Sequence, residues 1–329
     1  MRFLAGMAAA VAHSWSRRRT QNRCALLLAV ALVSCATDGG LEQPDDGLAV
    51  RDLGQFVQCL RVTGQTVVSA HRGGYGPVRA ENALATFEAS VEAAPMMLET
   101  DVRVTADGVL VLMHDETVDR TTTGTGAISA MSAAEVTRLA LTDNDGAPTG
   151  GFVPTLAQAL AWSQGRAILQ LDIKRGVPFP AVVEAVRRAG AQSRVIVIVY
   201  SIEDAALVHR LDPTLMLSVS IDDRADVEAL LAQGVDLSRV IAFTGIRAPD
   251  PALYAALADY GIEVIFGTLG GADSFDTRFA ASGDDSGYVD LQRQGVQIIA
   301  TQRAEAAFDA LDEADGRGWG PAVCLEAGQ

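Results

Sequence analysis

Two of the four histidines in the sequence directly follow short apolar runs of the kind that form buried strands. These are His71 and His114. Histidine gains and loses a proton near neutral pH, so a pair at neighbouring strand ends could act as general base and general acid. His209 lies in an expected helix and is interpreted as a surface residue.

Three carboxylates lie within similar apolar runs. Glu99 and Asp101 are two residues apart in one run, and Asp172 lies in another. Side chains two residues apart on a strand share a face, so Glu99 and Asp101 can point into one site. Carboxylate oxygens are the ligands that Ca²⁺ and Mg²⁺ prefer. We therefore expect these three residues to form a divalent-metal site.

Arg72 and Lys174 place positive charge next to these groups, where it could hold a phosphate. Lys174 stands two residues after Asp172 and is the single lysine among the 26 basic residues. An unpaired lysine inside an apolar strand would be costly, which favours a role beside carboxylates or a phosphate. Taken alone, each of these residues is more simply a solvated edge or a hydrogen-bonding cap; their combination indicates a site.

Such residues need a scaffold that gathers several strand ends. From residue 66 onward, short β-branched apolar runs alternate with amphipathic Ala- and Leu-rich stretches. The expected strands are 67–70, 96–102, 109–113, 167–173, 195–199, 215–221, 239–243, 262–266 and 297–300. The expected helices are 82–93, 155–164, 179–190, 202–211, 224–233, 251–260 and 303–313.

Apolar strands followed by helices predict a parallel sheet covered on both faces. Seven or eight such units in about 250 residues predict an α/β fold, the (β/α)8 TIM barrel, with its functional groups at the C-terminal strand ends. A doubly wound sheet is the alternative, but no Gly-rich dinucleotide fingerprint follows a strand.

Nine strands are one too many for this barrel. The second and third are joined only by the turn at 105–108, so one of that pair is expected outside the ring. Residues 117–153 are rich in Thr, Gly, Ser and Asp, with a short helical patch at 132–141. They predict a short excursion over one end of the barrel after the third strand.

The composition supports a large folded domain and excludes a nucleic-acid partner. The 329 residues are 49% hydrophobic and 20% charged, which is typical of a globular chain. The formal net charge of −15 offers no basic surface to a phosphate backbone.

The chain resembles the glycerophosphodiester phosphodiesterases, because a set of short motifs occurs in that family's order and spacing. The motifs are His71-Arg72-Gly73, Glu81-Asn82, Glu99-x-Asp101, Thr105-x-Asp107-Gly108, His114-Asp115, Asp119-Arg120-Thr121-Thr122-x-Gly124, Pro154-Thr155-Leu156 and Asp172-Ile173-Lys174. The resemblance covers about residues 66–313. Each motif is weak by itself, but the ordered set is highly specific.

The resemblance implies a TIM barrel that hydrolyses a small glycerophosphodiester to glycerol phosphate and an alcohol with the help of one divalent metal. It implies metal ligation by Glu99, Asp101 and Asp172, acid–base catalysis by His71 and His114, phosphate binding by Arg72 and Lys174, and a site-lining role for Glu81. Which histidine acts first is left open.

The sequence departs from the family pattern at several positions. The third metal ligand is usually Glu, and here it is the shorter Asp172; Ca²⁺, which tolerates irregular shells, is therefore favoured over Mg²⁺. The family's Pro-Glu-Asn-Thr is Ala80-Glu81-Asn82-Ala83 here, its Trp-Thr-Val-Asn is 266–269, and its final Thr-Asp is Thr301-Gln302. The late-strand changes are expected where the leaving alcohol binds.

Two other functions fit the same residues. One is a phospholipase D-like enzyme that acts on lysophospholipids with a similar barrel. The other is a lipoprotein that binds phosphodiesters without turnover, although the intact histidine pair argues against it.

Residues 1–35 resemble a secretory signal peptide with a lipobox. They contain five Arg and no acidic residue, and the apolar run at 24–33 leads into Leu32-Val33-Ser34-Cys35. About ten apolar residues are too few for a transmembrane helix. We expect an exported protein, periplasmic or tethered to the outer membrane through lipidated Cys35, with this anchor as its only membrane contact. An ordinary cleaved signal is the alternative.

Residues 36–65 are expected to form a tether and entry segment, residues 66–315 the barrel, and residues 316–329 a C-terminal tail. Cys59, expected on a strand before the barrel, and Cys324 flank the barrel. In an exported protein they could pair, but two free thiols are equally compatible with the sequence.

Overall fold

The computed structural model describes residues 48, 50 and 52–327. The expected signal peptide, Cys35 and residues 36–47 of the expected tether lie outside these residues. Within the described part, no helix is both long and apolar enough to span a membrane.

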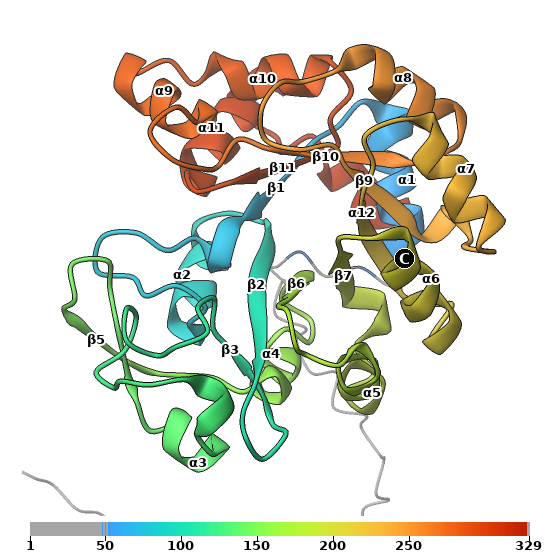
Figure 1. The fold of residues 1–329 in the computed structure, drawn as a ribbon. Helices are drawn as coiled ribbons and strands as arrows, with labels where there is room; N and C mark the ends of the chain where they lie inside the picture. Colours follow the sequence, from blue (N-terminus) through green and yellow to red (C-terminus); the bar gives the residue numbers. More distant parts are fainter. Residues whose placement is uncertain (1–47, 49, 51, 328–329) are drawn as a thin grey trace, which may run out of the picture. The chain divides into compact units, whose positions relative to one another are not determined.

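Eight parallel strands close into a barrel, as predicted (Figure 1). They are β1 (Val67–Ala70), β2 (Met97–Val104), β6 (Leu169–Ile173), β7 (Val195–Val199), β8 (Met216–Ser220), β9 (Val240–Phe243), β10 (Glu263–Gly267) and β11 (Ile298–Thr301). The ring closes because β1 pairs in parallel with both β2 and β11. The registers of β2, β6 and β7 place Asp101 opposite Asp172, and Asp172 opposite Ile198.

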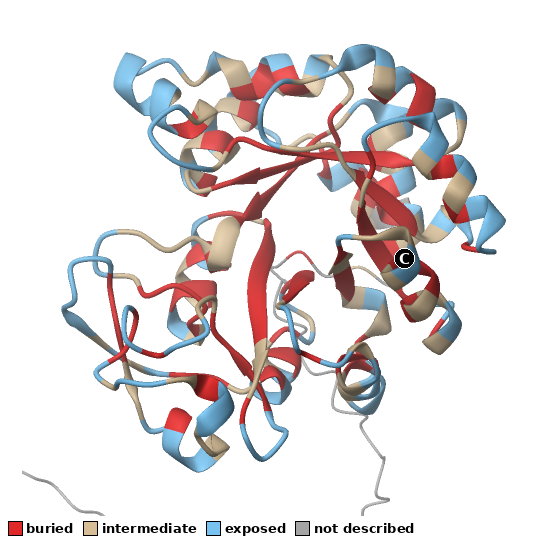
Figure 2. Ribbon diagram, viewed as in Figure 1, coloured by how far each residue is buried: buried red, intermediate tan, exposed pale blue. Residues whose placement is uncertain are grey.

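Helices cover the outside of the barrel. They are α2 (Leu84–Ala93), α4 (Leu156–Trp162), α5 (Phe179–Arg188), α6 (Ile202–Leu211), α7 (Arg224–Ala232), α8 (Pro251–Asp259), α9 (Phe275–Ser282), α10 (Ser286–Arg293) and α11 (Ala304–Ala314). Short 3-10 turns are η3 (Gln192–Arg194) and η4 (Leu237–Arg239). Figure 2 shows buried strands inside and helices whose outer faces are exposed.

The third expected strand lies outside the ring. β3 (Leu110–Leu112) pairs antiparallel with the end of β2, and the excursion follows it as η2 (Ile128–Ala130), α3 (Ala133–Val136), β4 (Ala140–Thr142) and β5 (Pro148–Phe152). The excursion has an apolar core of its own, which includes Val118, Ile128, Val136 and Leu141. It is therefore a small packed layer beside the barrel.

The end of the barrel away from the expected site is closed by two helices. In α1 (Leu53–Thr63), Phe56 and Leu60 pack against the first inward residues of the strands, such as Met97 and Ile168. α12 (Ala322–Ala327) packs against α1. Much of the expected tether and tail thus belongs to the folded body.

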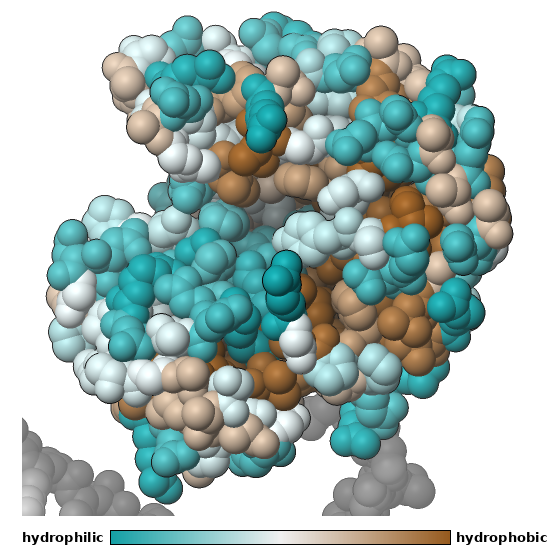
Figure 3. All heavy atoms as spheres, viewed as in Figure 1, coloured by the Kyte–Doolittle hydropathy of each residue, from teal (hydrophilic) through white to brown (hydrophobic). Residues whose placement is uncertain are grey.

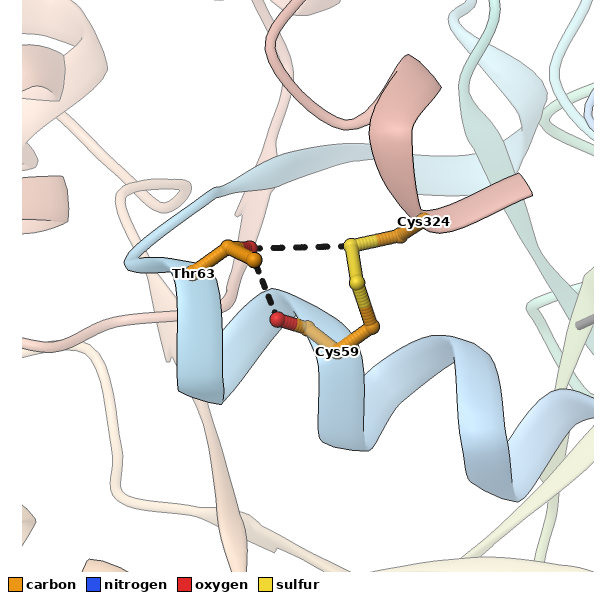
Figure 4. Close-up of a disulfide and its surroundings, with 3 residues drawn as sticks. All are labelled: Cys59, Thr63 and Cys324. Atoms are coloured by element: carbon orange, nitrogen blue, oxygen red, sulfur yellow. Dashed lines mark hydrogen bonds between the residues drawn. A yellow bond between two sulfur atoms is a disulfide. The ribbon is translucent and has the colours of Figure 1, made fainter. Parts of the chain in front are cut away.

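A disulfide joins these two helices. Cys59 and Cys324 are bonded, with their Cα atoms 5.5 Å apart, and Thr63 Oγ1 donates to the Cys59 carbonyl at 2.7 Å (Figure 4). Cys59 was expected on a strand before the barrel and instead lies on helix α1. The apolar residues of that segment follow a helical period, and they face the barrel end.

Candidate active site

The candidate site is built at the C-terminal ends of β1, β2 and β6, with help from the excursion. His71 and Arg72 begin η1 (His71–Gly73), the tight turn that follows β1. Arg72 has a positive φ of 51°, which turns the backbone sharply, and its N–H donates to Glu99 Oε2 at 2.7 Å. The turn thereby joins the first histidine to the acidic cluster on β2.

Glu99, Asp101 and Asp172 converge as expected: one carboxylate oxygen from each lies within 4.8 Å of the others. All three side chains are buried. Burial, followed by repulsion from Asp101 and Asp172, raises the pKa of Glu99 well above its usual value. The described residues around the cluster therefore compensate only part of its negative charge.

Lys174 provides that partial compensation. Its Nζ lies 2.6 Å from Asp101 Oδ1 and 2.5 Å from Asp172 Oδ2. Burial alone would raise the pKa of Asp101, but the Lys174 charge, the hydrogen bonds from Lys174 and Asn82 and the Arg72 charge together lower it below its usual value. The single lysine of the chain thus lies directly after β6, in contact with the acidic cluster.

Two residues that hold the carboxylates were not among the predicted site residues. Asn82 Nδ2 donates to Asp101 Oδ2 at 2.7 Å, while its Oδ1 accepts from Thr100 Oγ1 and from the Asp101 N–H. Tyr200, after β7, donates to Asp172 Oδ1 at 2.9 Å. The Glu81-Asn82 motif was a signal for the first; nothing in the sequence distinguishes Tyr200.

Glu81 lies between two arginines. It accepts from Arg72 Nη1 at 2.8 Å and from both terminal nitrogens of Arg120, at 2.9 and 2.8 Å. Its side chain is buried, and Arg72 Nε also lies 3.6 Å from Asp101 Oδ2. Glu81 therefore fixes the guanidinium of Arg72 beside the acidic cluster rather than facing the site by itself.

The two histidines have different surroundings. His114 Nδ1 lies 2.7 Å from Asp115 Oδ1, and its Nε2 makes no hydrogen bond within the part of the chain that the structure describes. His71 Nε2 lies 4.0 Å from Glu99 Oε2, and its Nδ1 is buried without a hydrogen-bond partner among the described residues. Burial, followed by the Arg72 charge, lowers the pKa of His71 to about 4.

The late strands carry a further set of contacts. Gln302 Nε2 donates to Tyr75 Oη at 2.7 Å, and the Tyr75 ring lies 6.0 Å from the His71 ring. Buried Asp276 accepts from the Gln302 N–H at 2.7 Å. Phe266 packs outward, edge-on against Phe275, so the replacement of the family's tryptophan at this position affects the helix layer instead of the mouth.

A cavity of about 370 Å³ lies beside this end of the site. It is lined by residues 74–79, Ser90 and residues 302–306. The space-filling view is hollowed between the surfaces over α2 and α11, with hydrophilic residues below the hollow and hydrophobic residues along part of its upper wall (Figure 3). A small ligand can therefore approach the barrel from this side.

All predicted residues of the barrel site are thus brought to one end of the fold. The arrangement offers two imidazoles, two cations and a buried acidic cluster that could hold a divalent cation. This combination can orient a phosphate and move protons on and off its oxygen substituents.

Known proteins share this fold and sequence pattern. The chain is 33% identical over 165 residues to YqiK, an uncharacterized protein of Bacillus subtilis, covering 48% of this chain and 68% of that protein. It is 31% identical over 162 residues to a glycerophosphodiester phosphodiesterase of Caldanaerobacter subterraneus, covering 47% and 66%. These alignments span about two thirds of each relative.

A glycerophosphoryl diester phosphodiesterase of Parabacteroides distasonis superimposes with a TM-score of 0.71 at 28% identity, covering 81% of this chain and 94% of that one. The model of the glycerophosphoryl diester phosphodiesterase family matches residues 71–264, which is more than half of the sequence. The matched segment contains both histidines, the acidic cluster and Lys174. The chain belongs to the glycerophosphoryl diester phosphodiesterase family.

Proposed function

We propose that this protein hydrolyses glycerophosphodiesters to glycerol phosphate and an alcohol. The observation that carries the proposal is the convergence of His71, His114, Arg72 and Lys174 on the acidic cluster at one barrel end. The family membership supports the same reaction.

The acidic cluster fits a divalent cation. Glu99, Asp101 and Asp172 are buried carboxylates within reach of one ion, and burial, followed by repulsion from the other two carboxylates, raises the pKa of Glu99. These three residues would hold the metal, which when bound supplies Lewis-acid stabilisation to the phosphate. We propose Ca²⁺ before Mg²⁺, because the short Asp172 side chain favours a looser coordination shell.

The side chains of the protein have separable parts in the reaction. Arg72 and Lys174 orient the phosphate and stabilise negative charge on its oxygens. His114, held at Nδ1 by Asp115, presents Nε2 for proton transfer. His71, which burial keeps neutral near pH 7, takes or gives the second proton.

Hydrolysis is tested with the purified protein on glycerophosphocholine and lysophosphatidylcholine, with product analysis. Release of glycerol phosphate and choline supports the proposal. Cleavage of lysophosphatidylcholine alone would favour the phospholipase D-like alternative. Binding without turnover at any added metal would favour the binding lipoprotein.

The metal is tested in the same assay. Excess chelator should abolish turnover, and Ca²⁺ should restore it better than Mg²⁺. Asp172→Asn should weaken calcium binding in a calorimetric titration, whereas Asp172→Glu should keep it. Full activity in excess chelator, with no metal found by elemental analysis, would contradict the metal site.

We further propose export and lipid anchoring at Cys35. The support is the order of basic cluster, short apolar run and Leu-Val-Ser-Cys in the sequence.

A further inference from the structure

We propose that Arg120 is a positioning residue that fixes the orientations of His114 and Arg72 in the active site. This inference rests on the proposed phosphodiester hydrolysis and adds a residue to it. The evidence is that the Arg120 guanidinium contacts two carboxylates. One of them contacts His114, and the other contacts Arg72.

The first carboxylate is Asp115. Arg120 Nε lies 2.7 Å from Asp115 Oδ2, and Arg120 Nη2 lies 3.0 Å from Asp115 Oδ1. The same Oδ1 contacts His114 Nδ1 at 2.7 Å. Because two Arg120 nitrogens fix the plane of the carboxylate, they also fix the direction from which it holds the imidazole.

The second carboxylate is Glu81. Arg120 contacts both of its oxygens, and Glu81 Oε2 also accepts from Arg72 Nη1 at 2.8 Å. Glu81 is buried, so without Arg120 only Arg72 would remain to balance it. Arg72 would then be drawn toward Glu81 and away from the phosphate position.

Arginine is suited to this role and lysine is not. Its planar fork presents donors in fixed directions, so one side chain can pair with two carboxylates at once. A lysine at this position would offer a single charged nitrogen that could satisfy one carboxylate at a time. Lys174, by contrast, bridges Asp101 and Asp172 only because those oxygens converge on one point.

The excursion supplies and fixes Arg120. The residue after it, Thr121, accepts from the Thr142 N–H, and Thr123 N–H donates to the Ala140 carbonyl, which ties this segment to β4. Thr121 Oγ1 also contacts Met113 beside β3. The excursion therefore has a catalytic consequence, because it holds the arginine that orients His114 and Arg72.

The test compares Arg120→Lys and Arg120→Gln in the full-length protein with the wild type. We expect kcat to fall by about 10-fold to 10²-fold, because small displacements of catalytic groups cost rates of this size. KM should rise as Arg72 shifts. The matched control is Arg187→Ala, since Arg187 is similarly exposed, 47% against 44%, and also pairs with a buried carboxylate, but on outer helix α5. Its kcat should equal that of the wild type.

If Arg120 acts by positioning, its substitution lowers activity only because Asp115 and Glu81 lose their partner. In an Asp115→Asn, Glu81→Gln background, adding Arg120→Gln should lower kcat/KM by less than threefold. If Arg120 instead touched the substrate, its full penalty would persist in that background, and the proposal would be wrong.

A spectroscopic readout separates positioning from a loss of folding. In histidine-labelled protein, the ring Nδ1–H of His114 should give a downfield proton signal, assigned by its absence in His114→Gln. The signal should disappear in Arg120→Gln while the melting temperature stays within a few degrees. An unchanged signal would overturn the proposal, and a wild type without any turnover would instead overturn the proposed function.

Discussion

At the scale of single residues, Asn82 is as informative as the acidic cluster that it contacts. It makes three hydrogen bonds to Thr100 and Asp101, and it does so from a positive φ of 57°, a conformation that asparagine tolerates better than most residues. One residue thus orients the carboxylate and satisfies the buried backbone N–H next to it.

Replacing Asn82 should damage both stability and metal binding. Asn82→Ala should lower the free energy of unfolding by about 2 kcal/mol, because buried polar groups lose their partners, and should weaken calcium binding. Asn82→Gly separates the causes, since glycine accepts the positive φ but restores no hydrogen bond. Denaturant unfolding and calorimetry measure the two effects. Equal calcium affinity in all three proteins would show that Asn82 does not orient Asp101.

Both histidines should be needed for turnover. His71→Ala and His114→Ala should each reduce kcat by at least about 10²-fold, as expected for a lost general acid or base, with little change in the melting temperature. His209→Ala is the control, because His209 lies on α6, away from the site, and accepts a hydrogen bond from the Asp236 N–H. Near-normal turnover in either variant would remove that histidine from the mechanism.

The residues that form the site could be predicted from the sequence better than the residues that hold them in place. The histidines, carboxylates and Lys174 occur within or directly after apolar strands, where their chemistry is unusual. Arg120 and Tyr200 lie in loops, where charged and aromatic residues are ordinary. Their roles depend on how the loops fold back over the barrel, and residue type and spacing do not specify this.

At the scale of elements, the apolar strands could be predicted because each reads as a continuous buried run. α9 and α10 could not, since their sequences are only eight residues long and rich in small and polar residues. α1 and α12 lay beyond the expected barrel limits. They matter because they fill the open end of the barrel interior with Phe56, Leu60 and their neighbours.

The bond between α1 and α12 should stabilise this closure. Cys59→Ser with Cys324→Ser should lower the free energy of unfolding by about 2–5 kcal/mol, because the bond constrains the unfolded chain between residues 265 apart. Turnover should persist, since the helices close the end away from the site. Non-reduced peptide mapping checks the bond itself; free thiols at both positions in protein from an oxidising compartment would exclude it.

Asp212, a buried carboxylate that directly follows α6 and pairs with Arg187 of α5, should make stability depend on pH. Burial alone would raise the pKa of Asp212, but hydrogen bonds from Thr214 and Arg187 hold it below its usual value. A depressed pKa adds stability above the unfolded-state value, near pH 4, and this stability is lost as pH falls through the folded-state value.

Asp212→Asn should therefore lower the free energy of unfolding by about 1 kcal/mol at pH 7 and progressively less below pH 4. Melting curves of both proteins at several pH values test this. A constant difference from pH 7 down to pH 2.5 would show that the charge of Asp212 is not responsible.

At the scale of the whole molecule, the two ends of the barrel have separate tasks. The site occupies the C-terminal ends of β1, β2 and β6, whereas Leu48 is buried in the apolar cluster that closes the other end. Leu48 therefore lies at the end of the barrel opposite the site.

This arrangement makes the proposed anchor testable apart from catalysis. Cys35→Ser should move the protein from the membrane fraction to the soluble fraction of the cells that make it, because lipidation of that sulfur is lost. The soluble variant should keep the wild-type kcat on glycerophosphocholine, since the change lies upstream of the end that α1 closes. Lysophosphatidylcholine embedded in vesicles is the contrasting substrate. If water-soluble diesters are the true substrates, the wild type and Cys35→Ser should show the same turnover of lysophosphatidylcholine. A wild-type protein already recovered in the soluble fraction would contradict anchoring at Cys35, whatever its activity.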